Sequence, residues 1–254
     1  MKITVVTAVK NGEKFIRDTV DSVLSQTGNF ELEYIIRDGV STDSTLAILD
    51  EYKADPRLTV ISQKDGSPQE AINAGMAMAT GDIGCWLNAD DVFEPETLQT
   101  VVTVFATQPQ LRWMYGRCRI VNNAGIEIRK PITLYKNIIG FFYSWNVLLC
   151  ENFINQPATF WRMDLWRELD ALDQQFKAAW DYELWLKMAT LARPLHLRKL
   201  LTSFRRHTES ISENHFEKQF AEELAISRKY GNLIHYLIHK FNVWKIVTVY
   251  KLLS

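Results

Sequence analysis

The first 130 residues alternate between short apolar runs rich in β-branched residues and segments whose apolar residues recur every three or four positions. The runs have the length and composition of buried strands, and the segments between them have the periodicity of amphipathic helices. The predicted strand–helix pairs comprise residues 3–26, 32–53, 57–79 and 81–108. Repeats of this kind build a parallel sheet with helices on both faces, so the sequence predicts an α/β fold.

The pattern changes after the fourth pair. Residues 111–130 are typical of a β-hairpin, with the turn sequence NNAG in the middle. Residues 131–155 are aromatic and lack a clear period, so we expect irregular structure there. The remaining predicted elements are helices from about Arg162 and Tyr182, a strand near 196–206 and a helical region after residue 209.

Composition excludes several classes of protein. The formal net charge is −1, without the basic excess of a general nucleic-acid-binding protein, so we expect no nucleic-acid partner. The three cysteines, Cys85, Cys118 and Cys150, are far apart, which argues against a disulfide framework or a zinc site. No apolar run reaches the roughly 18 residues that span a bilayer. Met1 leads directly into a predicted strand without a signal-peptide pattern, so we expect a cytoplasmic protein.

Polar and small residues gather where three of the predicted strands end. They are Thr7, Ala8, Lys10, Asp38, Asp43, Asp90 and Asp91. The carboxyl ends of parallel strands share one edge of the sheet, where ligands bind. Two adjacent acids repel each other, and a divalent cation would relieve that repulsion. Carboxylate and phosphate oxygens suit Mg²⁺ or Mn²⁺. The alternative is that Asp90 and Asp91 cap the next helix.

Two common phosphate-binding motifs are absent. The turn after the first strand lacks GxGxxG, which argues against a dehydrogenase, and the chain has no GxxxxGK[ST] loop. A phosphate-bearing ligand must then be held by a metal ion and basic side chains more than by a glycine-rich loop.

Four stretches in order resemble the family 2 glycosyltransferases of the GT-A fold. They are TVVTAVKNGEKFIRDTVDSVLSQ, YIIRDGVSTDST, DGSPQEAINAGMAMATGDIGCWLNADD and NQPATFWRMDLW followed by DYELWLKMA. The resemblance implies a GT-A-type, Rossmann-like, mostly parallel sheet flanked by helices, with a C-terminal helical extension. We expect a nucleotide-binding half at 1–120, an acceptor half at 121–208 and the extension at 209–254.

The resemblance also implies roles for individual residues. Thr7 and Ala8 would line the nucleoside pocket, with Asn73 also in the donor site, and Asp38 would accept a hydrogen bond from the base, usually uracil. Asp90 would bind the metal, Asp91 would contact the ribose or the metal, and Asp181 would be the catalytic base. Asn88 replaces the first acid of the family's DxDD pattern and can bond ribose but weakens the metal site by one charge. Many members carry a Lys where this chain has Ala74, so we consider Lys10 and Lys64 as the phosphate contacts in its place.

The expected reaction is inverting transfer of a sugar from a nucleotide-sugar donor, most often a UDP-sugar, to a glycan or lipid-linked acceptor. Asp181 begins a predicted helix, whose dipole would keep it ionised as a base. His207, beside Arg205 and Arg206, is a candidate to face the diphosphate or complete the metal shell. A nucleotidyltransferase and a binding module without activity stay open as alternatives, and Asn88 favours the second.

The C-terminal segment is apolar and basic. From Ile226 onward it has five Lys or Arg residues and no Asp or Glu. Such a segment can lie in a membrane interface, which would favour a lipid-linked acceptor on the cytoplasmic face. It can equally form helices packed on the catalytic domain or on another subunit of a homo-oligomer.

Overall fold

The computed structural model describes residues 1–169, 171–207 and 216–253. The strands are β1 (Lys2–Val9), β2 (Glu31–Asp38), β3 (Leu58–Ser62), β4 (Ile83–Trp86), β5 (Val92–Phe93), β6 (Trp113–Val121), β7 (Glu127–Ile128), β8 (Thr159–Arg162) and β9 (Leu195–Arg205). The helices are α1 (Ile16–Leu24), α2 (Thr45–Asp50), α3 (Pro68–Met78), α4 (Thr97–Thr107), α5 (Lys130–Phe141), α6 (Trp145–Cys150), α7 (Met163–Glu168), α8 (Trp180–Leu191), α10 (Phe216–Tyr230) and α11 (Leu233–Leu253), with a 3-10 turn η1 at Gln156–Ala158.

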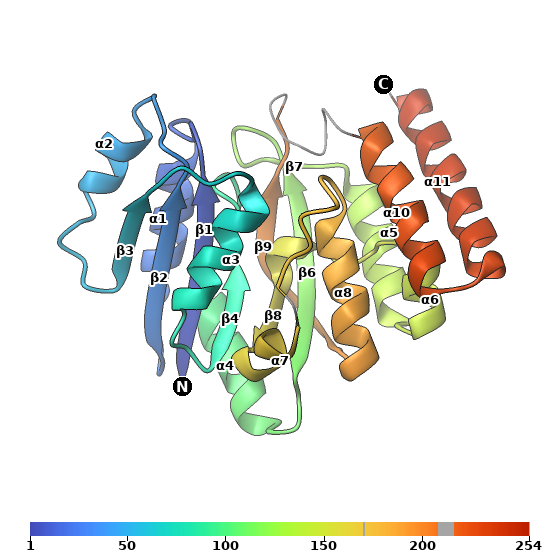
Figure 1. Cartoon of the computed structure of the whole chain (residues 1–254), viewed down its shortest axis with the longest axis horizontal. Helices are drawn as coiled ribbons and strands as arrows, with labels where there is room; N and C mark the ends of the chain where they lie inside the picture. Colours follow the sequence, from blue (N-terminus) through green and yellow to red (C-terminus); the bar gives the residue numbers. More distant parts are fainter. Residues whose placement is uncertain (170, 208–215, 254) are drawn as a thin grey trace.

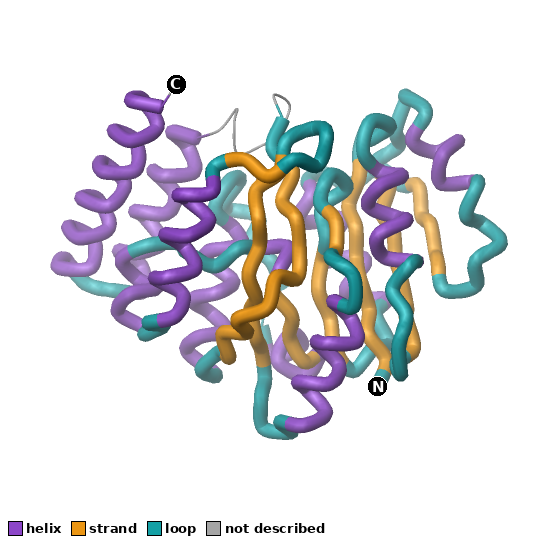
Figure 2. Tube along the Cα trace, turned by 180° about the vertical axis from the view of Figure 1, so that it is seen from behind, coloured by secondary structure: helices purple, strands orange, loops and turns teal. Residues whose placement is uncertain are grey.

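The strands form one sheet in the order β3-β2-β1-β4-β8-β6-β9-β5, and β7 pairs with β6. The β1–β2, β1–β4, β2–β3 and β6–β9 pairs are parallel, while β8 runs antiparallel to both of its neighbours. Helix α3 covers one face of the first strands and α1 covers the other (Figures 1 and 2). The prediction of a mostly parallel α/β sheet flanked by helices is confirmed.

Tryptophan residues form the centre of the core, where β4, β8 and α8 meet. Trp86, Trp161 and Trp185 are at most 1% exposed. The Trp86 and Trp185 rings stack with centroids 5.7 Å apart, and the partly exposed Trp180 stacks on Trp86 at 5.2 Å. Stacked rings bury large areas with defined geometry, so they fix α8 against the sheet. Trp180, directly before Asp181, is the outermost ring of this stack.

The expectation of irregular structure in residues 131–155 was wrong. This segment contains α5 and α6, and the Ser144 side chain caps α6 by accepting a hydrogen bond from the Val147 amide at 3.2 Å. The apolar period of α5 is hard to recognise because its outward face is also apolar, with Leu134 and Ile138 more than half exposed. A helix that is apolar on most sides lacks the contrast on which the prediction depends.

The C-terminal helices pack on the rest of the chain. Ser227 of α10 donates a hydrogen bond to the Leu149 carbonyl at 2.7 Å, and His239 of α11 contacts the same carbonyl at 3.0 Å. Figure 1 shows α10 and α11 beyond α8, at the end of the molecule opposite β3. Across the described residues, none of the helices combines the length and the apolar character that crossing a bilayer requires.

Candidate active site

The carboxyl ends of β1 to β4 meet at one edge of the sheet. In the parallel register Val9 pairs with Asp38, Asp38 pairs with Ser62, and Val6 pairs with Trp86. The loops that follow these strands therefore adjoin, as the sequence predicted.

Asp38 lies at this edge, but its carboxylate is fully buried. It accepts hydrogen bonds from the hydroxyl and amide of Ser41, at 2.5 and 3.1 Å, and from the Ser62 hydroxyl at 2.6 Å. The Ser41 hydroxyl also accepts a bond from the Asn11 amide. Asp38 thus ties together the loops after β1, β2 and β3. In this arrangement its oxygens accept hydrogen bonds from within the protein, and the predicted contact with a nucleotide base stays a prediction.

A second acid at the same edge was missed in the sequence. Asp65, three residues beyond β3, pairs with Arg37 at 2.9 Å, and their side chains are 7% and 6% exposed. Asp65 Oδ2 and Arg37 Nε are buried without a hydrogen-bond partner within the described residues. Buried polar atoms are rarely left unpaired, so these two atoms are candidates to meet a ligand. The signal available in the sequence was the position of Asp65 just beyond a strand end.

The other residues predicted to contact the nucleotide differ in how accessible their side chains are. The Thr7 hydroxyl is buried and donates to the Leu87 carbonyl at 2.7 Å, so its side chain joins β1 to the end of β4. Ala8 is partly exposed, and Lys10 and Lys64 are exposed. The Thr7 side chain is therefore structural, whereas the other three remain accessible to a ligand.

Asp90 is the accessible acid of the adjacent pair. Its side chain is 26% exposed, and its Oδ2 lies 2.9 Å from His207 Nε2. Within the described residues Asp90 Oδ1 has no hydrogen bond, so one oxygen stays available. No group of three or more His, Cys, Asp or Glu in the described chain is placed to hold a metal ion. The two side chains nevertheless suit a cation whose remaining ligands come from a bound phosphate and water.

Asp91 has a different environment from its neighbour. It is fully buried, Oδ1 accepts from the Arg205 amide at 2.9 Å, and Oδ2 accepts from the Asn88 side chain at 3.1 Å. Burial, and then the charge of Asp90, raise the pKa of Asp91 well above its ordinary value. Oδ1 thus joins β9 to the loop after β4, and Oδ2 holds the side chain of Asn88 in the same loop, while the expected contact of Asp91 with ribose or metal stays a prediction.

Two more side chains of this region form hydrogen bonds within the protein. The Asn88 amide donates to Asp91 and to Gln156 Oε1, so its NH₂ group is used inside the protein. Arg205, which lies two residues before the candidate His207, is 5% exposed and bonds the Asp90 carbonyl, the Asn123 carbonyl and the Asp18 carboxylate. These bonds stabilise the loop that presents Asp90.

Asp181 lies at the first turn of α8, and its Oδ1 accepts a hydrogen bond from the Tyr182 amide at 2.7 Å. Burial, and then the negative charge of Glu223, raise its pKa to about 7, while Lys136 acts in the opposite direction. The expectation that the helix dipole keeps Asp181 ionised was therefore wrong, because desolvation outweighs it. A carboxyl with this pKa can accept and release a proton near neutral pH.

Side chains from distant segments hold the loop before α8. Asn73 donates to the Leu172 carbonyl and accepts from its amide, at 3.0 and 2.9 Å, so its side chain has a structural role, and its expected contact with the donor stays a prediction. The Glu222 carboxylate of α10 accepts hydrogen bonds from the amides of residues 177–179 at 2.8 to 3.0 Å. Glu222, Glu223 and Lys136 were missed because nothing local in the sequence connects α5 or α10 to Asp181.

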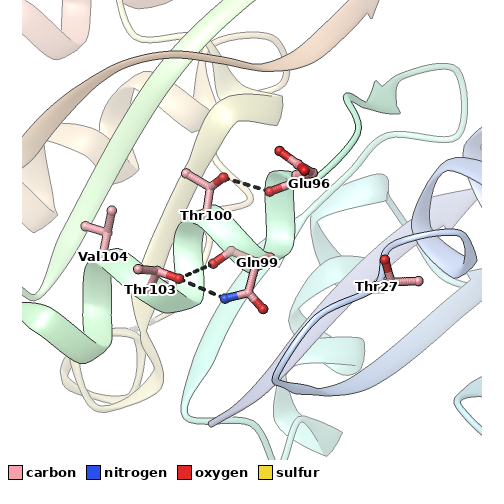
Figure 3. Close-up of a pocket in the computed structure, with 6 residues that line it drawn as sticks. All are labelled: Thr27, Glu96, Gln99, Thr100, Thr103 and Val104. Atoms are coloured by element: carbon pink, nitrogen blue, oxygen red, sulfur yellow. Dashed lines mark hydrogen bonds between the residues drawn. The ribbon is translucent and has the colours of Figure 1, made fainter.

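A hollow of about 380 Å³ lies elsewhere, against the outer side of α4 (Figure 3). Thr100 and Thr103 line it, and their hydroxyls donate to helix carbonyls at 2.8 Å. None of the strand-end acids lines this hollow, so it is separate from the candidate site.

The profile described as glycosyl transferase family 2 matches residues 4–167, which is more than half of the chain. The protein belongs to glycosyl transferase family 2. Among its relatives, the chondroitin synthase of Escherichia coli is 28% identical over 225 residues, covering 82% of this chain. The match spans only 30% of that synthase.

Solved structures support the same fold for this family 2 member. TarS 1–349 of S. aureus in complex with UDP-GlcNAc aligns with a TM-score of 0.68 at 19% identity, covering 89% of this chain and 66% of the other. The mannosyltransferase PcManGT from Pyrobaculum calidifontis, in complex with GDP-Man and Mn²⁺, aligns with a TM-score of 0.66 at 17% identity, covering 88% and 64%. The chain therefore has the GT-A fold, as the sequence resemblance predicted.

Proposed function

We propose that this family 2 glycosyltransferase transfers a sugar from a UDP-sugar to a hydroxyl group of a glycan or lipid-linked acceptor, with inversion at the anomeric carbon. The observation that supports this most is the environment of Asp181, an acid whose pKa of about 7 suits a general base. One base acting in a single displacement inverts the anomeric configuration.

The donor nucleotide would bind at the ends of β1 to β3. Asp65 Oδ2 lacks a donor and can accept the N3–H of a uracil ring, while Ala8 lies at the exposed end of β1. TarS binds UDP-GlcNAc, and PcManGT binds GDP-Man. Asp65 is our reason for choosing uracil, because a carboxylate recognises an imide N–H directly.

Asp90 and His207 would hold a Mn²⁺ or Mg²⁺ ion. Asp90 Oδ1 is available as an oxygen ligand, and the His207 ring offers a nitrogen ligand, which suits either ion. With two protein ligands, most coordination positions would be filled by the diphosphate of the nucleotide-sugar and by water. When bound, such an ion stabilises the negative charge that develops on the departing diphosphate. Lys10 and Lys64, both exposed, are the basic side chains that would reach the phosphates.

Asp181 would remove the proton of the acceptor hydroxyl as that oxygen attacks the anomeric carbon. Trp180 stacks on Trp86 and supports the start of α8, so the base is held on a rigid part of the core. The likeness to chondroitin synthase favours a role in polysaccharide assembly, which we place on the cytoplasmic side of the membrane.

A donor screen tests this function. The full chain is incubated with UDP-, GDP- and TDP-sugars and Mn²⁺, and release of nucleoside diphosphate is measured with and without glycan acceptors. We expect turnover with a UDP-sugar, loss of at least about a hundredfold in Asp181→Asn, and retained UDP binding by calorimetry in that variant. Release of pyrophosphate would indicate a nucleotidyltransferase, and UDP binding without turnover on any donor would indicate a silent binding module.

A further inference from the structure

Helices α5 and α11 direct an unusual number of large apolar side chains away from the core. We call this set the apolar face. Its members, between 45% and 66% exposed, are Leu134, Ile138 and Phe141 of α5, Phe142 directly after α5, and Leu233, Ile234, Leu237, Ile238, Phe241 and Trp244 of α11. Single exposed apolar residues are ordinary, but a contiguous set of this size marks an interaction surface.

The two helices contribute to one surface. Ile138 of α5, Phe142 directly after α5, and Ile238 and Asn242 of α11 line the same cavity of about 440 Å³, which α6 closes on the third side. Three members of the apolar face, Ile138, Phe142 and Ile238, therefore border a single groove. Helix α11 lies at the outer end of the molecule, opposite β3 (Figures 1 and 2), so this groove is remote from the predicted base-binding loops.

The charge of the same segments is one-sided. Residues 129–150 contain three Lys or Arg and no acid, and residues 226–254 contain five and no acid. The whole chain has a net charge of −1, so the rest of the protein is acidic overall. Lys240 is exposed on α11, and the Arg198 guanidinium lies 4.1 Å from the centre of the Phe141 ring. Lys240 and Arg198 thus place positive charge beside the apolar face, whereas Lys229 and Lys245 are engaged by Glu183 and Tyr135.

We propose that the apolar face docks the protein on a bilayer rich in anionic phospholipid, with α5 and α11 lying in the plane of the interface. Apolar side chains enter the headgroup region while neighbouring Lys and Arg side chains pair with lipid phosphates. A second copy of this chain fits less well, because a two-fold interface would bring the same basic segments together. At 21 residues α11 is about 32 Å long, but its lysines interrupt the apolar sequence, so it lies on the membrane and does not cross it.

Vesicle flotation of the full chain tests this without donor or acceptor, so the proposal can fail independently of the transfer reaction. Vesicles of phosphatidylcholine mixed with phosphatidylglycerol are compared with phosphatidylcholine alone. We expect binding to the mixed vesicles that weakens in high salt, and little binding to the neutral ones.

A double variant, Leu237→Glu with Phe241→Glu, should lower partitioning at least about tenfold, since it places two charges in the inserted face. The control is Leu46→Glu with Met78→Glu, which adds the same charge on α2 and α3 at positions 36% and 45% exposed. Circular dichroism checks that both variants stay folded.

Trp244 is 62% exposed and serves as an internal reporter, whose emission should shift to the blue on binding and lose that shift in Trp244→Phe. Three outcomes would overturn the proposal: no flotation of the wild type, equal losses in both double variants, or a stable dimer that Leu237→Glu with Phe241→Glu dissociates.

Discussion

The variant Asp181→Asn should lose activity and gain stability, because the wild-type carboxyl is ionised in a site that disfavours its charge. The ordinary pKa of this carboxyl is 3.8, and burial together with Glu223 raises it to about 7 in the folded protein. Between these values the folded state keeps a proton that the unfolded chain has released. Wild-type stability therefore falls as pH rises through this window and is lowest above pH 7.

The magnitude follows from the two pKa values. Each pKa unit corresponds to about 1.4 kcal/mol, so the raised pKa costs the folded protein at most roughly 4 kcal/mol at pH 8, where Asp181 is ionised, and about 1.6 kcal/mol at pH 5, where the folded carboxyl keeps a proton that the unfolded chain releases. Asparagine has nearly the same shape and never ionises. The free energy of unfolding of Asp181→Asn should thus exceed that of wild type by roughly 2 kcal/mol more at pH 8 than at pH 5.

Urea unfolding of both proteins at pH 5 and pH 8 measures this difference, with Asp164→Asn as the control for loss of an acid whose side chain is 65% exposed. The wild-type kcat/KM should rise about tenfold between pH 6 and pH 8, with a midpoint near 7, since only the ionised base accepts a proton. Equal stability of Asp181→Asn and wild type at pH 8, or a pH-independent kcat/KM, would refute the reasoning.

Four further predictions concern other residues of the candidate site. In Glu223→Gln, loss of the nearby charge should lower the pKa of Asp181 and move the acidic limb of the kcat/KM profile to lower pH; an unchanged limb would contradict this. Glu222→Ala removes the acceptor of three successive loop amides, so it should lower the free energy of unfolding by about 2 kcal/mol in a urea titration and should reduce kcat. Unchanged stability and kcat in this variant would show that these three hydrogen bonds are not needed to hold the loop. Asp90→Asn should abolish the Mn²⁺ dependence of UDP affinity in calorimetry, and an affinity that still depends on Mn²⁺ would show that Asp90 is not a metal ligand. Asp65→Asn should weaken UDP binding both with and without Mn²⁺.

The strand ends were the most predictable part of the site. Parallel strands terminate at one edge, so Asp38, Asp65 and Asp90 are neighbours for a reason that local sequence encodes. Which of these acids faces a ligand was not predictable. Asp38 accepts hydrogen bonds from Ser41 and Ser62, and Asp91 accepts them from Asn88 and Arg205. These partners lie up to 114 residues away along the chain.

The C-terminal half was less predictable for a related reason. Helix α5 is apolar on both its buried and its exposed sides, so the sequence shows no clear alternation of apolar and polar residues with a helical period. Its exposed apolar side can be interpreted only once the structure shows that α11 lies beside it. The hydrogen bonds from Glu222 of α10 to the loop before α8 depend on how the helices pack, and no local sequence pattern predicts that packing.

The sequence alone determined the strand–helix alternation, the shared edge of strand ends and the family, because these depend on short-range periodicity and on motifs in order. Only the tertiary structure decided which acids are buried and partnered, and that Asp181 has a pKa near neutral. The physical reason is that desolvation and charge–charge interactions depend on distance in space. The charge that tunes Asp181 comes from Glu223, on a helix that the sequence places far away.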